Sequence, residues 1–178
     1  MLTQTLLTDL QGPLWIGTYK GLARYANRRF TAIAPPPSEA AAIDVRDIRE
    51  TADVRILVAT PSGVFEARSD ALVPLVGAPE VRALAFLPDG TSLWIGTEGG
   101  AWRIDAAGAR LLPLEDQGQP VTVTRFVRAH GHLGAGSNRG LTVLVEDRWQ
   151  RYEEGGLLSL PIEAMFEDRD GNFWIAST

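Results

Sequence analysis

The chain alternates short apolar segments with turn residues, and five of these segments are alike. Each runs into a small residue such as Gly17, and in four of them a glycine such as Gly21 follows four positions later. The five segments are 14–18, 57–60, 93–97, 133–137 and 173–177. They recur about 40 residues apart, a period typical of one supersecondary unit repeated side by side. The pattern therefore predicts a repeat array.

The first repeat shows the expected unit. Apolar and alternating residues predict strands over 5–9, 14–18, 21–26 and 29–33, with turn residues between them. The prolines after residue 34 cannot join a ladder because they lack the N–H donor. Each repeat is therefore expected to be a sheet of four antiparallel strands.

Four-stranded antiparallel units at this period predict an all-β fold, a β-propeller. The whole of 1–178 is expected to be a single partial propeller with four complete blades and the first two strands of a fifth. The expected blades are about 5–33, 43–75, 81–114 and 121–152, followed by a half-blade at 161–178. Helical solenoids fit less well because the chain has no amphipathic helical stretch.

The unfinished fifth repeat bears on assembly. An open array leaves strand edges and a blade face uncovered, and such surfaces associate. We expect the chain to be a fragment of a larger propeller, or to complete itself by self-association through its open blade edges. A closed four-bladed ring with a dangling hairpin is the alternative.

Composition excludes several classes of function. The net charge is -5 with no cluster of Lys and Arg, so we expect no nucleic-acid partner. There is no apolar run long enough to span a membrane and no export signal at the start of this chain. The sequence contains no cysteine, which removes disulfides, thiolate catalysis and cysteine-based zinc sites.

Loops between the second and third strands are expected on one face of the array, near its axis. Binding residues concentrate in loops that a rigid scaffold positions. The candidate ligand-binding residues there are Tyr19, Lys20, Ser62, Glu98, Asn138 and Arg139. Ordinary solvated turns are the alternative interpretation for each of them taken singly.

No catalytic, cofactor or metal site is expected. His130 and His132 form a His-x-His pair, but spacing predicts no third ligand. Asp168 to Gly171 begins like a calcium loop, yet an apolar strand follows at once. No catalytic triad, phosphate loop or pair of glycosidase carboxylates can be assembled from spacing.

The repeats resemble the two-component regulator propeller repeat family. Its pattern is an acidic turn, Gly, Leu-Trp-Ile-Gly-Thr, two variable residues, Gly-Leu and Arg-Tyr, and residues 9–25 match nearly throughout. Residues 89–97 and 168–177 also match well. The second copy has Val58 and Ala59 where Trp and Gly are expected to fall in the pattern, and the fourth has Gly134 in place of Trp.

This resemblance implies the periplasmic sensor region of bacterial hybrid histidine kinases and diguanylate cyclases. It implies a non-catalytic module that binds an extracellular ligand, an unknown small molecule or an oligosaccharide, and signals to a downstream kinase or cyclase domain. Any such enzymatic activity would lie outside this chain. A protein–protein scaffold is the alternative function, and a propeller lyase or hydrolase is a further one.

Overall fold

The part of the chain that the structure describes consists of strands, turns and loops. The computed structural model describes residues 3–36, 43–79, 81–152 and 160–177. Within these ranges there is no helix of the length and hydrophobicity that crossing a bilayer requires. Contacts divide the chain into two compact units, Met1–Leu84 with Pro88–Ser92 and Ala85–Leu87 with Leu93–Thr178. Each unit is described by itself.

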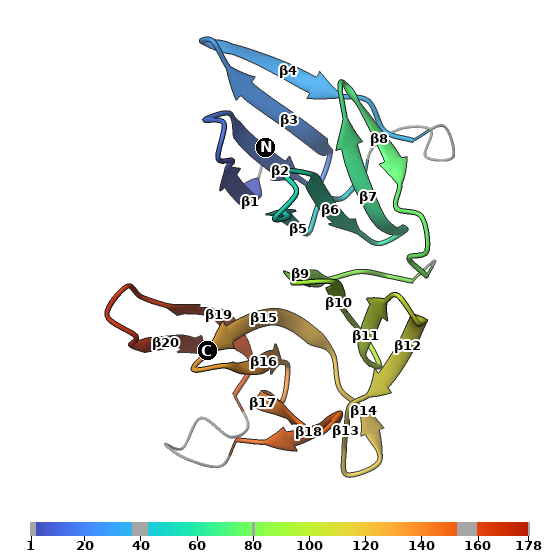
Figure 1. Cartoon of the computed structure of the whole chain (residues 1–178), viewed down its shortest axis with the longest axis vertical. Coiled ribbons are helices and arrows are strands. Elements are labelled where there is room, and N and C mark those ends of the chain that lie inside the picture. The colour runs from blue at the N-terminus through green and yellow to red at the C-terminus, as the bar shows by residue number, and fades with distance from the viewer. Residues whose placement is uncertain (1–2, 37–42, 80, 153–159, 178) are drawn as a thin grey trace. The chain divides into compact units, whose positions relative to one another are not determined.

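The first unit contains two four-stranded antiparallel sheets in which spatial order follows chain order (Figure 1). The first sheet consists of β1 (Thr3–Thr8), β2 (Leu14–Thr18), β3 (Gly21–Ala26) and β4 (Arg29–Ile33). The second consists of β5 (Asp47–Glu50), β6 (Ile56–Thr60), β7 (Gly63–Arg68) and β8 (Ala71–Pro74).

The strand expected from residue 43 begins only at Asp47. The Val45 N–H donates to the carbonyl of Thr18 and the Arg46 N–H to that of Ala59, both at 2.9 Å. This segment therefore divides its hydrogen bonds between two sheets instead of joining one ladder.

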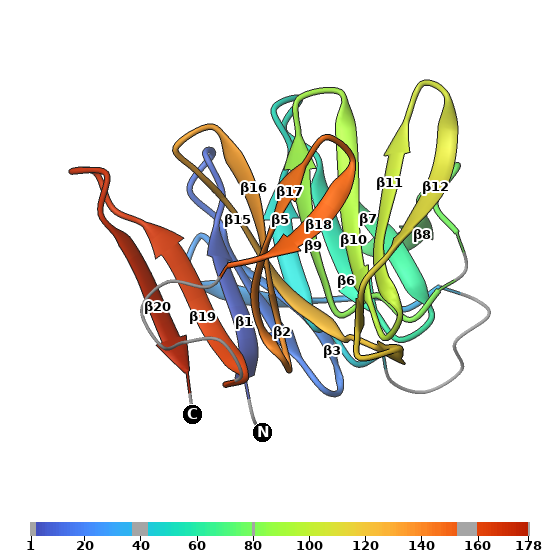
Figure 2. The ribbon, with the colours of Figure 1, turned by 90° about the horizontal axis from the view of Figure 1, so that it is seen from below.

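The second unit continues the pattern. The third sheet consists of β9 (Ala85–Asp89), β10 (Ser92–Thr97), β11 (Gly100–Asp105) and β12 (Gly108–Pro113). It belongs to the second unit except for Pro88–Ser92, where β9 turns into β10. The fourth consists of β15 (Val123–Ala129), β16 (His132–Ser137), β17 (Gly140–Val145) and β18 (Arg148–Arg151). The last is the two-stranded sheet of β19 (Ile162–Glu167) and β20 (Phe173–Ser177), and β19 packs beside β15 (Figure 2).

These sheets are the blades of a β-propeller. The predicted fold class, four complete blades and the first two strands of a fifth, is confirmed. One element was not expected from the sequence, a small hairpin of β13 (Glu115–Asp116) and β14 (Gln119–Pro120) between the third and fourth blades.

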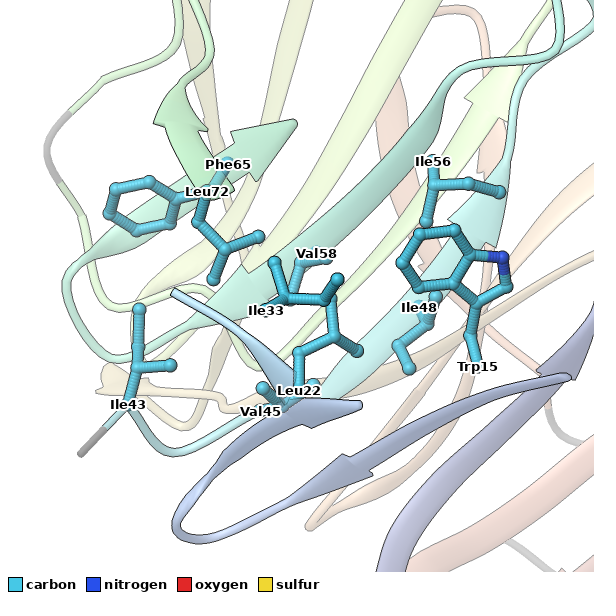
Figure 3. Packing of buried hydrophobic residues seen from close by; sticks show 10 residues of the cluster. All are labelled: Trp15, Leu22, Ile33, Ile43, Val45, Ile48, Ile56, Val58, Phe65 and Leu72. Atoms are coloured by element: carbon cyan, nitrogen blue, oxygen red, sulfur yellow. The ribbon is translucent and has the colours of Figure 1, made fainter. Parts of the chain in front are cut away.

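Apolar side chains between successive blades form the core of each unit. In the first unit the Trp15 ring lies beside Ile48 and Ile56 of the next blade (Figure 3). Trp15 is only 5% exposed and Val58 is fully buried. Because both faces of a middle blade are covered, the second strands are apolar at successive positions instead of alternating.

In the second unit Trp94 takes the place that Trp15 has in the first. It is 3% exposed and meets Trp149 of the fourth blade edge to face, with ring centroids 6.0 Å apart. Tryptophan at this position of the repeat therefore packs between blades in the first and third repeats, whereas Trp174 of the fifth is 55% exposed.

Glycine in the second strand allows neighbouring blades to approach closely. A Cβ on Gly17 would lie 2.5 Å from Cγ1 of Val45, and one on Gly96 would lie 2.6 Å from the carbonyl oxygen of Val123. Real Cβ atoms do not come this close, so a side chain at Gly17 would need Val45 to shift, and one at Gly96 would need the backbone at Val123 to shift.

The acidic turn before the second strand is held by its own aspartate. Trp15 Nε1–H donates to Asp9 Oδ2, and Trp174 Nε1–H donates to Asp168 Oδ2, each at 2.7 Å. In the third repeat Asp89 stands one position nearer to its tryptophan, and the Trp94 Nε1 atom is buried with no hydrogen-bond partner among the described residues. The indole–carboxylate hydrogen bond thus forms in the two repeats where the tryptophan stands six positions after the aspartate. In the third repeat, where it stands five positions after, the Trp94 indole does not make it.

We expect Gly96→Ala to lower the free energy of unfolding by about 1–3 kcal/mol, because its Cβ meets backbone atoms that cannot move alone. Gly134→Ala is the matched control, since its nearest neighbour is a methyl of Val127 at 3.1 Å, and it should cost less than about 1 kcal/mol. Urea unfolding followed by tryptophan fluorescence measures both. Equal losses would contradict the close-packing argument.

The hydrogen bond from Trp174, with those from Asn172, lowers the pKa of Asp168 to about 2. Because folding lowers this pKa, the contribution of the carboxylate to stability is present above about pH 4 and is lost as the pH falls through about 2. The indole N–H resonance of Trp174 should therefore shift with a midpoint near pH 2. In Asp168→Asn it should not titrate there, and a wild-type midpoint near 4 would contradict the assignment.

Candidate ligand-binding site

A buried hydroxyl closes each hairpin between the second and third strands. In the first repeat the Lys20 N–H donates to Thr18 Oγ1 at 3.1 Å, and the Thr18 hydroxyl donates to the Gly21 carbonyl at 3.0 Å. Thr60, Thr97 and Ser137 make the same pair of contacts in the next three repeats. We call this arrangement the hydroxyl clamp.

The clamp fixes the two residues at each hairpin tip, and these are the predicted binding positions. The glycine that ends each tip has a positive φ, for example +136° at Gly21, a region that other residues rarely adopt. All six predicted side chains are exposed at these tips. Tyr19, Lys20 and Ser62 lie in the first unit, and Glu98, Asn138 and Arg139 lie in the second.

The tip in the fourth blade carries the richest polar surroundings. Arg151 Nη1 donates to Asp116 Oδ1 at 3.1 Å, and its Nη2 donates to the Arg139 carbonyl at 3.2 Å. Arg139 Nη1 lies 3.8 Å from Asp116 Oδ2. A small cavity of about 70 Å³ opens here between these groups and Trp149. The unexpected β13–β14 hairpin supplies its carboxylate.

On its other side the same tip borders a second cavity, of about 210 Å³. Asn138 and Arg125 line it together with Glu163. Arg125 Nε donates to the Glu163 carbonyl at 2.8 Å, which holds the guanidinium across the opening. Asn138 Oδ1 accepts from the Thr122 N–H at 3.1 Å, so the amide is oriented.

Together these two hollows form the candidate site, centred on Asn138 and Arg139. Three guanidinium groups surround one tip, and Arg139 is the most available of them. Its side chain is 53% exposed, and its guanidinium donates no hydrogen bond to another described residue. Guanidinium groups bind carboxylates and hydroxyl-rich molecules through paired N–H donors. The arrangement is therefore suited to binding a polar ligand.

The comparisons with known proteins bear directly on the last repeat. Residues 156–178 match the family model described as two component regulator propeller. Over these residues the chain is similar to a two-component regulator propeller repeat. The match includes the stretch from Asp168 to Ser177, and it confirms the resemblance inferred from the repeats. None of the curated proteins compared with the chain matches it.

Solved structures resemble this chain over nearly its whole length. The extracellular domain of BT4673 from B. thetaiotaomicron, described as a hybrid two component system, is 23% identical, with a TM-score of 0.76 over 98% of this chain and 26% of that chain. That of BT3049 from B. thetaiotaomicron is 18% identical, with a TM-score of 0.76 over 98% and 27%. Virginiamycin B lyase from Staphylococcus aureus is 11% identical, with a TM-score of 0.72 over 98% and 62%.

At these identities the likeness is one of fold. The chain spans about a quarter of the length of the two extracellular domains it resembles. Activities, ligands and partners of those whole proteins therefore do not pass directly to this chain.

The other predicted positions lie at similar tips. In the first unit Lys20 Nζ lies 5.5 Å from the centre of the Tyr19 ring, and the Ser62 N–H is held by Thr60 Oγ1 at 3.1 Å. Glu98 is exposed at the β10–β11 tip of the second unit. Ligand binding stays a prediction for the tips that carry Tyr19, Lys20, Ser62 and Glu98.

A larger cavity, of about 420 Å³, lies on the face of the fourth blade. Val127, Leu141 and Val143 form its apolar wall, and His130 and His132 line its edge. Gly134 stands at the position of the packing tryptophan, which explains the hollow. Within the described ranges, no three His, Cys, Asp or Glu side chains gather as metal ligands would.

A polar cavity of about 210 Å³ lies in the first unit, where its lining includes turn residues outside the predicted tips. Asp9, Glu50 and Glu66 meet Arg24 and Arg55 there. Hydrogen bonds from Arg68 lower the pKa of Glu66 below its ordinary value. Glu66 forms ion pairs with Arg55 and Arg68, Asp9 accepts from the Trp15 indole, and Glu50 accepts from the Leu10 N–H.

We expect Thr60→Val to lower the free energy of unfolding by about 1–3 kcal/mol, because the Ser62 N–H and the Gly63 carbonyl lose their partner. Thr60→Ser keeps the hydroxyl, as Ser137 does naturally, and should lose less than half as much. Urea unfolding of both variants tests the clamp. A serine variant as unstable as the valine variant would show that the methyl group matters instead.

Proposed function

We propose that this chain is a non-catalytic ligand-sensing module of a bacterial signal-transduction receptor. The two-component regulator propeller match and the fold shared with extracellular domains of two-component systems support this role. The single observation that carries the ligand-binding part is the clamped tip of Asn138 and Arg139, which is rigid, exposed and flanked by two hollows.

The ligand we propose is an extracellular carbohydrate, met in the periplasm or outside the cell. Arg125, Arg139 and Arg151 offer guanidinium donors and Asp116 offers an acceptor, the two kinds of group that hydroxyl groups of a sugar can pair with. Arginine pairs with carboxylates in a bidentate manner, which favours sugars that bear carboxylate groups over neutral ones.

The signal would pass to a kinase or diguanylate cyclase domain in a part of the receptor outside these residues. A binding module needs no turnover, and the tip holds no nucleophile paired with a base. Instead, a ligand bound at the Asn138–Arg139 tip would change the hydrogen bonds of the β16–β17 tip and of β18. Both elements belong to the same rigid blade, so binding would be transmitted through strand packing.

Two other functions have specific support. The fold is shared with a lyase, whose activity would appear as turnover of a substrate. A protein–protein scaffold is favoured by exposed apolar faces such as that of Trp174, which is 55% exposed. Turnover, binding of a folded partner and binding of a sugar alone are three distinguishable results.

Calorimetric titration with oligogalacturonides and with neutral cello-oligosaccharides tests the proposal. We expect the acidic sugars to bind without being cleaved, and Arg139→Ala to weaken binding about tenfold or more, as loss of a charge-assisted hydrogen bond does. Arg148→Ala is the matched control, because Arg148 is exposed at the opposite end of the same hairpin pair. It should bind normally.

Cleavage products would favour a lyase or hydrolase. Equal weakening by Arg139→Ala and Arg148→Ala would indicate general charge attraction and would contradict the site. Failure of every sugar to bind would contradict the carbohydrate assignment.

A further inference from the structure

The β13–β14 hairpin is held at the candidate site by one side chain. It projects from the connection between β12 and β15 (Figure 1). Of residues 115–120, Asp116 is the one that is not exposed, and its side chain is 19% exposed. Leu114 and Val121 at the base of the hairpin are buried, and the Val121 N–H donates to the Leu114 carbonyl at 2.9 Å. The base is therefore fixed, whereas the hairpin itself is anchored through Asp116.

The ladder of this hairpin is short. β13 and β14 pair at two positions, Glu115 with Pro120 and Asp116 with Gln119. Pro120 has no N–H to donate to the ladder. Because so short a pair of strands is only marginally stable by itself, release of the Asp116 side chain would free the hairpin down to its base.

Asp116 makes incomplete use of the two arginines that it meets. Its Oδ1 accepts from Arg151 Nη1 at 3.1 Å, but its Oδ2 lies 3.8 Å from Arg139 Nη1, which is longer than a hydrogen bond. A carboxylate in the best geometry accepts two parallel N–H bonds from one guanidinium. A second carboxylate could therefore pair with Arg139 better than Asp116 does.

The cavity of about 70 Å³ between these groups limits what can enter. Asp116, Arg139 and Arg151 line it together with Trp149. Its volume admits a small substituent and leaves a sugar ring outside. A carboxylate inserted there would lie beside that of Asp116, and two like charges at such a separation repel each other unless one of them moves away.

We propose that Asp116 occupies the position that a ligand's carboxylate takes at Arg139 and Arg151, and that an acidic ligand displaces it and so releases the β13–β14 hairpin. This inference rests on the proposed function, because it concerns how the same site selects its ligand. Asp116 is then a specificity-determining residue. A neutral sugar leaves it in place as an acceptor, whereas an acidic sugar replaces it. Acidic ligands therefore have a structural effect that neutral ones lack.

Calorimetric titration of Asp116→Asn with oligogalacturonides tests the displacement. The variant removes the charge and keeps the shape of the side chain, so the sugar no longer competes with a carboxylate. We expect its Kd to be about tenfold lower than that of the wild type, the effect of one charge-assisted hydrogen bond that need not be broken. Neutral cello-oligosaccharides should not bind the variant more tightly. A Kd for oligogalacturonides that is unchanged or higher would overturn the proposal.

Asp147→Asn is the matched control. Asp147 also lies between two arginines, 3.3 Å from Arg103 Nη1 and 3.2 Å from Arg110 Nη1, at the turn between β17 and β18. Its replacement changes the net charge by the same amount without touching the tip, so this variant should bind as the wild type does. Equal tightening in both variants would indicate general charge attraction and would also overturn the proposal.

The heteronuclear NOE of backbone amides 116–119 measures the mobility of the hairpin. On saturation of the wild type with oligogalacturonides the NOE should fall to the value that Asp116→Asn shows before any sugar is added. The same spectra show that each variant is folded. An NOE that stays unchanged in the saturated wild type would contradict release of the hairpin.

Acetate separates this inference from the carbohydrate assignment. At constant ionic strength, acetate should shift the guanidinium resonances of Arg139 and Arg151 at lower concentration in Asp116→Asn than in the wild type. That result, together with failure of every sugar to bind, would support displacement and contradict the carbohydrate assignment. Equal acetate concentrations in the two proteins would overturn displacement even where sugars bind.

Discussion

A hydrogen-bonded hydroxyl at the end of the second strand closes the hairpin tip in each of the four complete blades. At the tip of each of these hairpins, backbone groups would otherwise be buried without partners. Thr18 and its counterparts accept one N–H and donate to one carbonyl, which satisfies both groups without water. The blade can therefore pack on both faces down to its tip, and the two tip residues are left rigid and exposed. Structure and candidate site depend on the same contact.

The repeats differ most where function is proposed. The clamp is constant, but the tip residues change from Tyr19-Lys20 to Asn138-Arg139. In the fourth blade Asp116 reaches the tip from the inserted hairpin and orders two arginines around it. The Asp116 side chain is 19% exposed whereas that of Arg139 is 53% exposed, so the shared carboxylate lies partly sheltered behind the tip. This combination of a constant frame and a variable tip is what a binding module requires.

Departures from the repeat pattern have consequences that can be followed in the packing. Gly134 replaces a packing tryptophan, and the face of the fourth blade is hollow at that point. In the third repeat a turn shorter by one residue leaves Trp94 without the carboxylate that holds Trp15. Trp94 is nevertheless buried by Trp149, so apolar burial outweighs the missing hydrogen bond. Packing between blades therefore dominates the position of this side chain.

The fold could be predicted because its determinants are local and repeated. Apolar segments, turn glycines and their constant spacing specify strands and hairpins, and four such units specify blades. The exposed tips were predicted for the same reason. The β13–β14 hairpin was missed because Glu115 to Pro120 contain no apolar alternation and belong to no repeat.

Other features were decided only by tertiary contacts. The meeting of Asp116 with Arg139 and Arg151 joins residues far apart in sequence. The six-residue spacing from Asp9 to Trp15, and again from Asp168 to Trp174, was visible in the sequence, but its hydrogen bond was not. Local patterns thus determined the blades, whereas the charges that meet around a tip depend on how separate segments pack, because side chains interact through space and not along the chain.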